Sequence, residues 1–295
     1  GGVNVDPTTD PFWDHPRIAA LIELALAEDV GAGDRTSEAL VPTGTPARGR
    51  LAAKERLVVC GLPLLHRIFR RRVSADLGAV RVMLHAAEGA TAVAGERLAT
   101  LDGHARALLA GERVSLNLLQ HLCGIATLTR ACVDRVRGTP LVVRDTRKTL
   151  PGFRLLAKYA VRMGGGTNHR MTLDDAILIK DNHLALCGGD VQAAVRAARA
   201  AWPTLSLEVE CRTLAEVDTA VGAAPDLILL DNMSLADIVA AVQLVRGRIP
   251  LEVSGGVHPE DLPEVASTGV AFVALGAITH SARAADLHLK IEPLA

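Results

Sequence analysis

Six short apolar runs alternate with helical patterns after Pro140, and this alternation limits the possible folds more than any other feature of the chain. The runs, all between residues 141 and 277, are LVVR, AILIK, LSLEVE, DLILLD, PLEVSGG and AFVALGA. Strands that alternate with helices predict a parallel sheet with right-handed crossovers. About six such units with short linkers favour an α/β barrel over an open doubly wound sheet, although the sequence leaves the closure of the barrel open.

The first third of the chain lacks this regular alternation. Residues 17–30 and 62–72 have helical patterns, and residues 50–61 read as a strand that ends in a turn. AVRVML and GERLATLDG are further candidate strands. This mixture predicts a small α+β domain. A long helical region begins at His104, with Gly111 and Gly124 as candidate interruptions.

Composition excludes several classes of function. The chain has 295 residues, 49% of them hydrophobic, which is enough for a sizeable core. A net charge of −1 and 2% aromatic residues argue against a nucleic-acid partner. No apolar run reaches the roughly 18–20 residues of a membrane span, and the first ten residues do not resemble a signal peptide. Five scattered cysteines without CxxC spacing indicate reduced thiols, so we expect a cytoplasmic protein without membrane attachment.

Polar residues follow each of the six apolar runs. In a barrel of parallel strands the carboxyl ends all open at one face, so we expect these residues to meet there. One segment, RDTRKTLPGFR, carries four cations within eleven residues, although the chain as a whole is nearly neutral. The sequence therefore predicts a local site for anions at this face.

These polar residues form two chemical sets. The cationic set suits carboxylates or phosphates and consists of Arg147, Lys148, Arg170 and Lys180, with His169 beside them. The second set contains Glu210 and Asp231, which could hold Mg²⁺ or sugar hydroxyls. Backbone N–H groups suited to a phosphate are offered by Ser254, Gly255 and Gly256 and by Leu275, Gly276 and Ala277. Together the sets predict a phosphorylated, metal-chelated sugar beside a small, multiply anionic molecule.

The series DTRKTLPGFRLLAKYAVRMGGGTNHR, LIKDNH, LEVE, LILLDN, EVSGG and GAITHS closely resembles the quinolinate phosphoribosyltransferase family. The resemblance runs in order from EDVGAGDRTS to THSARAADLHLKI and covers nearly the whole chain. It implies a pentosyltransferase that joins phosphoribosyl pyrophosphate to quinolinate with decarboxylation. The implied products are nicotinate mononucleotide, CO₂ and pyrophosphate, and the implied pathway is de novo NAD biosynthesis. The implied cofactor is Mg²⁺.

The resemblance assigns a role to each matching position. Quinolinate is expected to contact Arg113, Thr146, Arg147, Lys148, His169, Arg170 and Lys180. Phosphoribosyl pyrophosphate is expected to contact Lys54, Glu210, Asp231, Ser254, Gly255, Gly256, Leu275, Gly276 and Ala277. The expected catalytic residues are Lys148, Glu210 and Asp231, and the last two would hold Mg²⁺ directly or through water.

The resemblance also implies an architecture. Residues 1–120 would form an N-terminal α/β sandwich, and residues 121–278 an incomplete α/β barrel of about six parallel strands. Residues 279–295 would be a final helical segment that packs back on the sandwich. Two chains would form a head-to-tail homodimer with shared active sites, in which Lys54 and Arg113 of each subunit reach into the active site of the other. Hexamers also occur in the family. Cys123 stands where the family usually has Ser.

Three other functions and two structural roles for single residues stay open at this point. A paralogue of the same fold associated with molybdenum transport would take a different substrate. A Schiff-base aldolase would use Lys180 as its nucleophile, and a phosphate or carboxylate sensor would bind without turnover. His169 could merely cap the GGG turn, and Glu208 is expected to be a structural partner of Glu210, since alternate residues of a strand share a face.

Overall fold

The computed structural model describes residues 10–70 and 77–294, and the chain divides into two compact units. The first unit contains the described residues up to Leu128, together with Leu150–Gly165 and the residues from Ala282 onward. The second contains Thr129–Thr149 and Gly166–Ser281. Compared with the expected boundaries, residues 150–165 belong with the first unit although they lie between two strands of the second.

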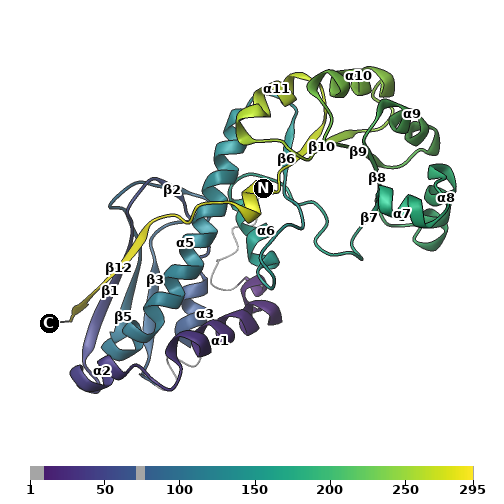
Figure 1. Ribbon diagram of the computed structural model, residues 1–295. Coiled ribbons are helices and arrows are strands. Elements are labelled where there is room, and N and C mark those ends of the chain that lie inside the picture. The colour runs from purple at the N-terminus through teal and green to yellow at the C-terminus, as the bar shows by residue number, and fades with distance from the viewer. Residues whose placement is uncertain (1–9, 71–76, 295) are drawn as a thin grey trace. The chain divides into compact units, whose positions relative to one another are not determined.

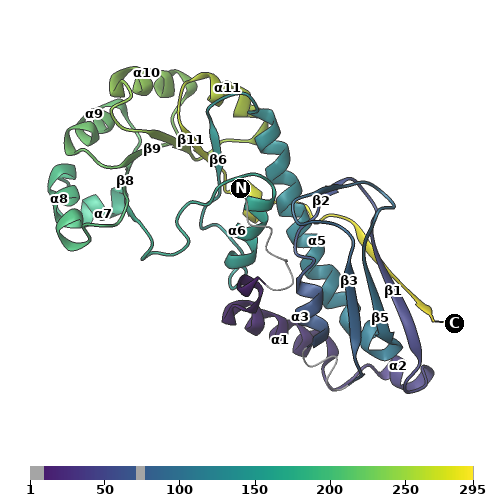
Figure 2. The same ribbon diagram turned by 180° about the vertical axis from the view of Figure 1, so that it is seen from behind.

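The first unit contains a four-stranded antiparallel sheet with helices on one side (Figures 1 and 2). The strands, in spatial order, are β12 (Leu287–Pro293), β1 (Pro46–Ala53), β5 (Arg97–His104) and β3 (Val80–Leu84). In β1, Ala47, Gly49 and Leu51 are buried, whereas Arg48 and Arg50 between them are not. This period of two gives the sheet one face for the helices and one polar face. The prediction of a two-layer α/β domain is confirmed.

The helical layer of the first unit comes from separate parts of the chain. Its helices are η1 (Pro11–Asp14), α1 (Pro16–Val30), α2 (Arg35–Leu40), α3 (Leu64–Arg70), α6 (Arg154–Met163) and the greater part of α5 (Ala105–Arg135). A separate two-stranded sheet joins β2 (Leu57–Val58) to β4 (Thr91–Ala92). Of the helix expected at residues 62–72, the last two residues lie outside the described part of the chain.

Helix α5 is continuous, so the expected interruptions at Gly111 and Gly124 are wrong. Both glycines make room for a neighbour instead. A Cβ atom on Gly111 would lie 2.5 Å from the Phe69 ring, and one on Gly124 would lie 2.1 Å from the carbonyl oxygen of Arg283. The helix tolerates the low propensity of glycine because close packing along α5 requires it.

The end of the chain is a strand and not the expected helical segment. In β12 Leu287 and Leu289 are buried, while His288 and Lys290 are exposed, which is the period of a strand. β12 pairs with β1 in antiparallel register from Leu287 opposite Ala53 to Pro293 opposite Ala47. Strand pairing therefore decides the structure of this segment.

Cys123 has a structural position in the first unit. Its Sγ accepts a hydrogen bond from the Cys60 N–H at 3.3 Å and donates one to the Cys60 carbonyl oxygen at 3.4 Å. Burial raises the pKa of the Cys123 thiol to about 12. A neutral, buried thiol of this kind serves packing and not chemistry.

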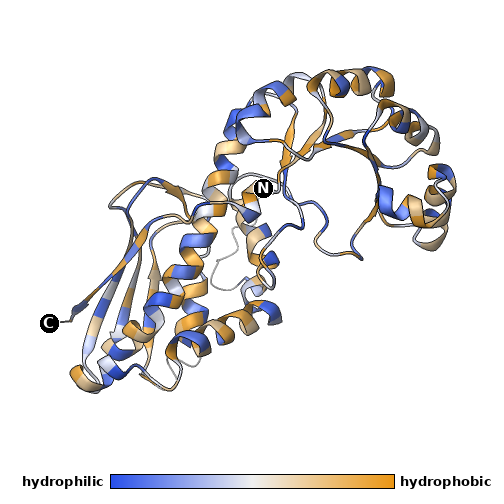
Figure 3. Ribbon diagram, viewed as in Figure 1, coloured by the Kyte–Doolittle hydropathy of each residue, from blue (hydrophilic) through white to orange (hydrophobic). Residues whose placement is uncertain are grey.

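The second unit contains six parallel strands, as the six apolar runs predict. In spatial order they are β6 (Val142–Arg144), β11 (Phe272–Ala274), β10 (Leu251–Ser254), β9 (Leu227–Asp231), β8 (Leu207–Cys211) and β7 (Ile177–Ile179). β6 and β7 form the two edges, so the barrel is incomplete, and the strands curve in an open arc (Figure 1). Figure 3 colours these strands largely hydrophobic, as expected for a parallel sheet buried on both faces.

Helices α8 to α11 cover the outer side of this arc in both ribbon views (Figures 1 and 2). The helices of the second unit are α7 (Asp181–Leu186), α8 (Val191–Ala201), α9 (Leu214–Ala223), α10 (Leu235–Val245), η2 (Pro259–Asp261), α11 (Leu262–Ser267) and α12 (Ala277–His280). Within residues 10–70 and 77–294, every helix is too short or too polar to cross a bilayer.

Candidate active site

A pocket of about 720 Å³ lies at the carboxyl ends of the six parallel strands. Thirteen of the predicted site residues line it: Thr146, Arg147, Lys148, His169, Arg170, Lys180, Glu210, Asp231, Ser254, Gly255, Gly256, Gly276 and Ala277. Leu275 does not line it: its side chain is buried, and its N–H donates to the carbonyl oxygen of Arg144 at 3.0 Å. Lys54 and Arg113 are exposed residues of the first unit.

The buried carboxylate of Asp145 fixes the loop that carries two of the predicted residues. It accepts hydrogen bonds from the Asn168 side chain at 2.6 Å and from the His169 N–H at 2.8 Å. Thr167 forms a parallel bridge to the last residue of β6. These contacts hold His169 and Arg170 beside the end of β6, although both residues belong to a loop and not to a strand.

The Lys148 side chain packs against Gly276. Its N–H donates to Thr146 Oγ1 at 3.0 Å, and its carbonyl oxygen accepts a hydrogen bond from the Thr279 hydroxyl at 2.8 Å. A Cβ atom on Gly276 would lie 3.0 Å from Lys148 Cδ. The glycine therefore leaves space for the lysine side chain to enter the pocket.

The cationic half of the pocket is formed by Arg147, Lys148, Arg170 and Lys180, whose positive charges repel one another. Burial and the positive charge of Arg147 lower the pKa of the Arg170 guanidinium. Arg170 Nη1 donates to the carbonyl oxygen of Ala176 at 3.2 Å, which fixes its direction. A ligand with one or more carboxylates would relieve the repulsion and match the planar guanidinium groups.

The carboxylate half lies on β8 and β9. The Glu210 side chain is 8% exposed and the Asp231 side chain is 17% exposed. Burial raises the pKa of Glu210, Lys180 opposes this with its Nζ 3.7 Å from Glu210 Oε2, and the charge of Asp231 raises the pKa further. Two carboxylates that disfavour each other's charge suit Mg²⁺ or the hydroxyls of a sugar.

The Ser254–Gly256 turn approaches these carboxylates closely. Gly255 has φ of +81° and Gly256 has φ of +66°, values that favour glycine. A Cβ atom on Gly255 would lie 2.7 Å from both Asp231 Oδ1 and Asn232 Oδ1. Only a bare backbone fits here, and such a backbone can present N–H groups to a phosphate.

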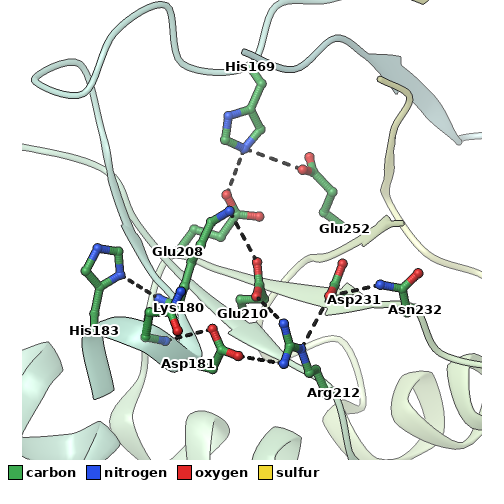
Figure 4. A network of polar contacts seen from close by, with 11 residues as sticks. His169, Lys180, Asp181, His183, Glu208, Glu210, Arg212, Asp231, Asn232 and Glu252 are labelled. Atoms are coloured by element: carbon green, nitrogen blue, oxygen red, sulfur yellow. Dashed lines mark hydrogen bonds and ion pairs between the residues drawn. The ribbon is translucent and has the colours of Figure 1, made fainter. Parts of the chain in front are cut away.

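His169 uses both ring nitrogens within the protein. Its Nδ1 accepts a hydrogen bond from the Arg170 N–H at 2.8 Å, so the proton of the neutral ring is on Nε2. That Nε2 donates to Glu208 Oε2 at 2.8 Å and lies 3.4 Å from Glu252 Oε1 (Figure 4). The role of His169 as a quinolinate ligand stays a prediction. Glu208, which was expected to be a structural partner of Glu210, is buried and accepts this hydrogen bond from His169.

Glu252 is a fully buried acid in the lining of the pocket. Arg144 Nη1 donates to Glu252 Oε2 at 2.9 Å, and the same guanidinium lies 3.9 Å from the centre of the Phe272 ring. Burial raises the pKa of Glu252 to about 7; Glu208 adds to the rise, while His169 and Arg144 oppose it.

The pocket lining also contains residues that were not predicted as site residues from the sequence, among them Arg212, Glu252 and His280. A signal existed for Arg212, which stands two residues beyond Glu210 at the same strand end. Glu252 lies inside an apolar run and His280 in a short helix, so neither position carried a signal of its own.

Family models match both parts of the chain. The N-terminal domain of quinolinate phosphoribosyl transferase matches residues 34–123, and its C-terminal domain matches residues 125–290. The nicotinate-nucleotide pyrophosphorylase [carboxylating] of Mycobacterium leprae is 45% identical over 274 residues, 92% of this chain and 95% of that protein. The quinolinate phosphoribosyltransferase [decarboxylating] 1b of Nicotiana tabacum is 37% identical over 98% of this chain and 85% of its own length.

Solved structures match the whole fold. The crystal structure of NadC from Streptococcus pyogenes has a TM-score of 0.88 and 38% sequence identity, and the match covers 97% of this chain and 98% of that one. The incomplete α/β barrel, its pocket and these relatives together identify an enzyme of the phosphoribosyltransferase class. More narrowly, the chain belongs to the quinolinate phosphoribosyltransferase family.

Proposed function

We propose that this chain transfers the phosphoribosyl group of phosphoribosyl pyrophosphate to quinolinate, with decarboxylation, in NAD biosynthesis. The products are nicotinate mononucleotide, CO₂ and pyrophosphate. The observation that carries the proposal is the division of one pocket into a cationic and a carboxylate half. The cationic half suits a pyridine dicarboxylate, and the carboxylate half suits the hydroxyls of a sugar phosphate.

The reaction needs position and charge more than a covalent enzyme nucleophile. As the C1–pyrophosphate bond breaks, C1 gains positive character that Glu210 and Asp231 can stabilise. The pyridine nitrogen bonds to C1 and becomes cationic. As CO₂ leaves, the electron pair of the carbon–carboxylate bond stays on the ring carbon, where the adjacent cationic nitrogen stabilises it, and a proton from water then binds to that carbon. Lys148, which lines the pocket, would hold an anionic group of either substrate.

Glu210 and Asp231 have the oxygen donors that Mg²⁺ prefers, and their mutual proximity favours a bound cation. They would hold Mg²⁺ directly or through water. The ion would supply positive charge for the pyrophosphate group.

A homodimer with shared sites is part of the proposal. Arg113 and Lys54 match the family pattern, yet both belong to the first unit and are exposed there, so each is available to a second copy of the chain. We also propose a cytoplasmic location, supported by five cysteines that are all unpaired thiols.

The proposal is tested by CO₂ release from quinolinate, phosphoribosyl pyrophosphate and Mg²⁺, with nicotinate as a parallel substrate. We expect CO₂ with quinolinate and no mononucleotide from nicotinate. Arg147→Ala and Lys148→Ala should each lower kcat/KM at least about 100-fold, because each leaves a substrate anion without its partner in the pocket. Arg196→Ala, which removes an exposed cation on the outer helix α8, should keep the wild-type rate.

Two results would contradict the proposal. Wild-type rates in both pocket variants would remove the assigned substrate pocket. No product from either pyridine would favour the paralogue of the same fold with a different substrate.

A further inference from the structure

Arg212 lies among three carboxylates of the pocket. Its Nη1 is 2.5 Å from Asp181 Oδ2, its Nε is 3.5 Å from Asp231 Oδ2, and its Nη2 is 3.9 Å from Glu210 Oε1. Figure 4 shows the guanidinium between these three groups. Two of them, Glu210 and Asp231, are the residues proposed to hold Mg²⁺.

The backbone at this position does not depend on the guanidinium. Arg212 follows the last residue of β8, and its N–H donates to Glu216 Oε2 at 2.6 Å at the start of α9. The side chain is 53% exposed, so it can leave the carboxylates without opening the core. Its contacts to Glu210 and Asp231 are long, which is the geometry of a loosely held counter-ion and not of a bidentate salt bridge.

Two positively charged side chains, Lys180 and Arg212, approach the Glu210–Asp231 pair from different strands. Lys180 approaches Glu210 from the cationic half, with its Nζ 3.7 Å from Glu210 Oε2. Arg212 approaches both Glu210 and Asp231 from the residue that follows the carboxyl end of β8. A divalent ion at the same carboxylates would be repelled by a guanidinium that already lies against them, so one of the two cations must give way.

We propose that Arg212 is a displaceable counter-ion that occupies the Glu210–Asp231 pair in the free enzyme and weakens the binding of a divalent cation there. When the metal enters, the guanidinium leaves the pair and its charge becomes available to the pyrophosphate group of the substrate. Arg212 thereby sets the metal concentration that the enzyme requires. This inference rests on the proposed Mg²⁺ site.

The test measures Mn²⁺ binding to the substrate-free protein by calorimetry, with Mn²⁺ in place of Mg²⁺. We expect Arg212→Gln to lower the Kd for Mn²⁺ about 5- to 10-fold at low salt, and this gain should shrink as ionic strength rises. Arg212→Lys, which keeps the charge, should stay close to the wild type. Arg196→Gln is the matched control, since it removes the same charge from the outside of α8 and should not change the Kd.

Glu210→Gln separates the two levels of the inference. If it abolishes Mn²⁺ binding while Arg212→Gln matches the wild type, the metal site stands and the counter-ion role of Arg212 is overturned. Weaker binding by Arg212→Gln also overturns it, because Arg212 would then support the metal site. If no variant binds Mn²⁺ at millimolar concentration, both the metal site and this inference fall.

Discussion

At the residue scale, the buried acid Glu252 lies in a cluster of charged and titratable side chains at the pocket. It faces Arg144 from β6, Glu208 from β8 and His169 from the loop before β7. Burial raises its pKa to about 7. The folded chain therefore holds a proton on Glu252 between about pH 4.5 and pH 7, a range in which the unfolded chain releases it.

This retained proton gives a pH dependence of known sign. The folded state binds more protons than the unfolded state in that window, so its contribution to stability is complete below about pH 4.5 and disappears as the pH rises through about 7. Glu252→Gln removes this titration. We expect the wild type to lose roughly 2 kcal/mol of unfolding free energy relative to Glu252→Gln between pH 5 and pH 7.5.

Urea denaturation at several pH values measures this difference. Glu264→Gln on the outer surface of α11 is the control for the loss of a carboxyl, and its pH profile should follow the wild type. If the profiles of Glu252→Gln and the wild type are parallel, Glu252 does not hold the proton assigned to it.

The sequence could predict the pocket residues that follow strands, because the strands of a parallel barrel all run in one direction and their carboxyl ends therefore lie at one face. It predicted Lys180, Glu210 and Asp231 in this way. It could not predict the hydrogen bonds of His169, since these depend on Asp145 and Glu208, which are distant in the chain. The counter-ion position of Arg212 likewise depends on three strand ends at once.

At the element scale, α5 illustrates how packing overrides local propensity. Glycine at positions 111 and 124 predicts breaks, yet the helix passes through both without interruption. The decisive contacts come from Phe69 and from the carbonyl oxygen of Arg283, and neither is visible from residues near the glycines. For the same reason the sequence did not reveal that β12 pairs with β1.

Gly124→Ala tests this account of α5. Its Cβ would lie 2.1 Å from the Arg283 carbonyl oxygen, so the terminal segment must shift, and we expect a loss of about 2–3 kcal/mol in unfolding free energy. The matched control is Gly222→Ala in α9, where the nearest atom is the mobile end of Gln192 at 3.2 Å. There the higher helix propensity of alanine should leave the stability unchanged or raise it by up to about 1 kcal/mol.

Thermal and urea unfolding of the two variants distinguish a packing role from a propensity effect. Equal effects of both substitutions would mean that the contact with Arg283 has no energetic weight. A destabilised Gly124→Ala that still assembles would place the effect in packing within the first unit.

At the scale of the whole molecule, the proposed homodimer places residues of two chains in each active site. Glu210 lies in the pocket of the second unit, whereas Arg113 is exposed in the first unit. In a homodimer with shared sites, Arg113→Ala and Glu210→Gln would damage the same active site from different chains. A mixed dimer of the two variants would then have one site with both defects and one intact site.

Co-expression with two affinity tags yields such mixed dimers after two purification steps. Each variant alone should be nearly inactive, and the mixed dimer should recover about half of the wild-type rate of CO₂ release. The control combines Arg147→Ala with Glu210→Gln, two residues that line the pocket of the same chain. Every site of that mixed dimer carries one defect, so it should stay inactive. If the mixed dimer of Arg113→Ala and Glu210→Gln has only background activity, Arg113 does not act across subunits. If that mixed dimer recovers activity and the control mixed dimer does not, the active site is built from two chains.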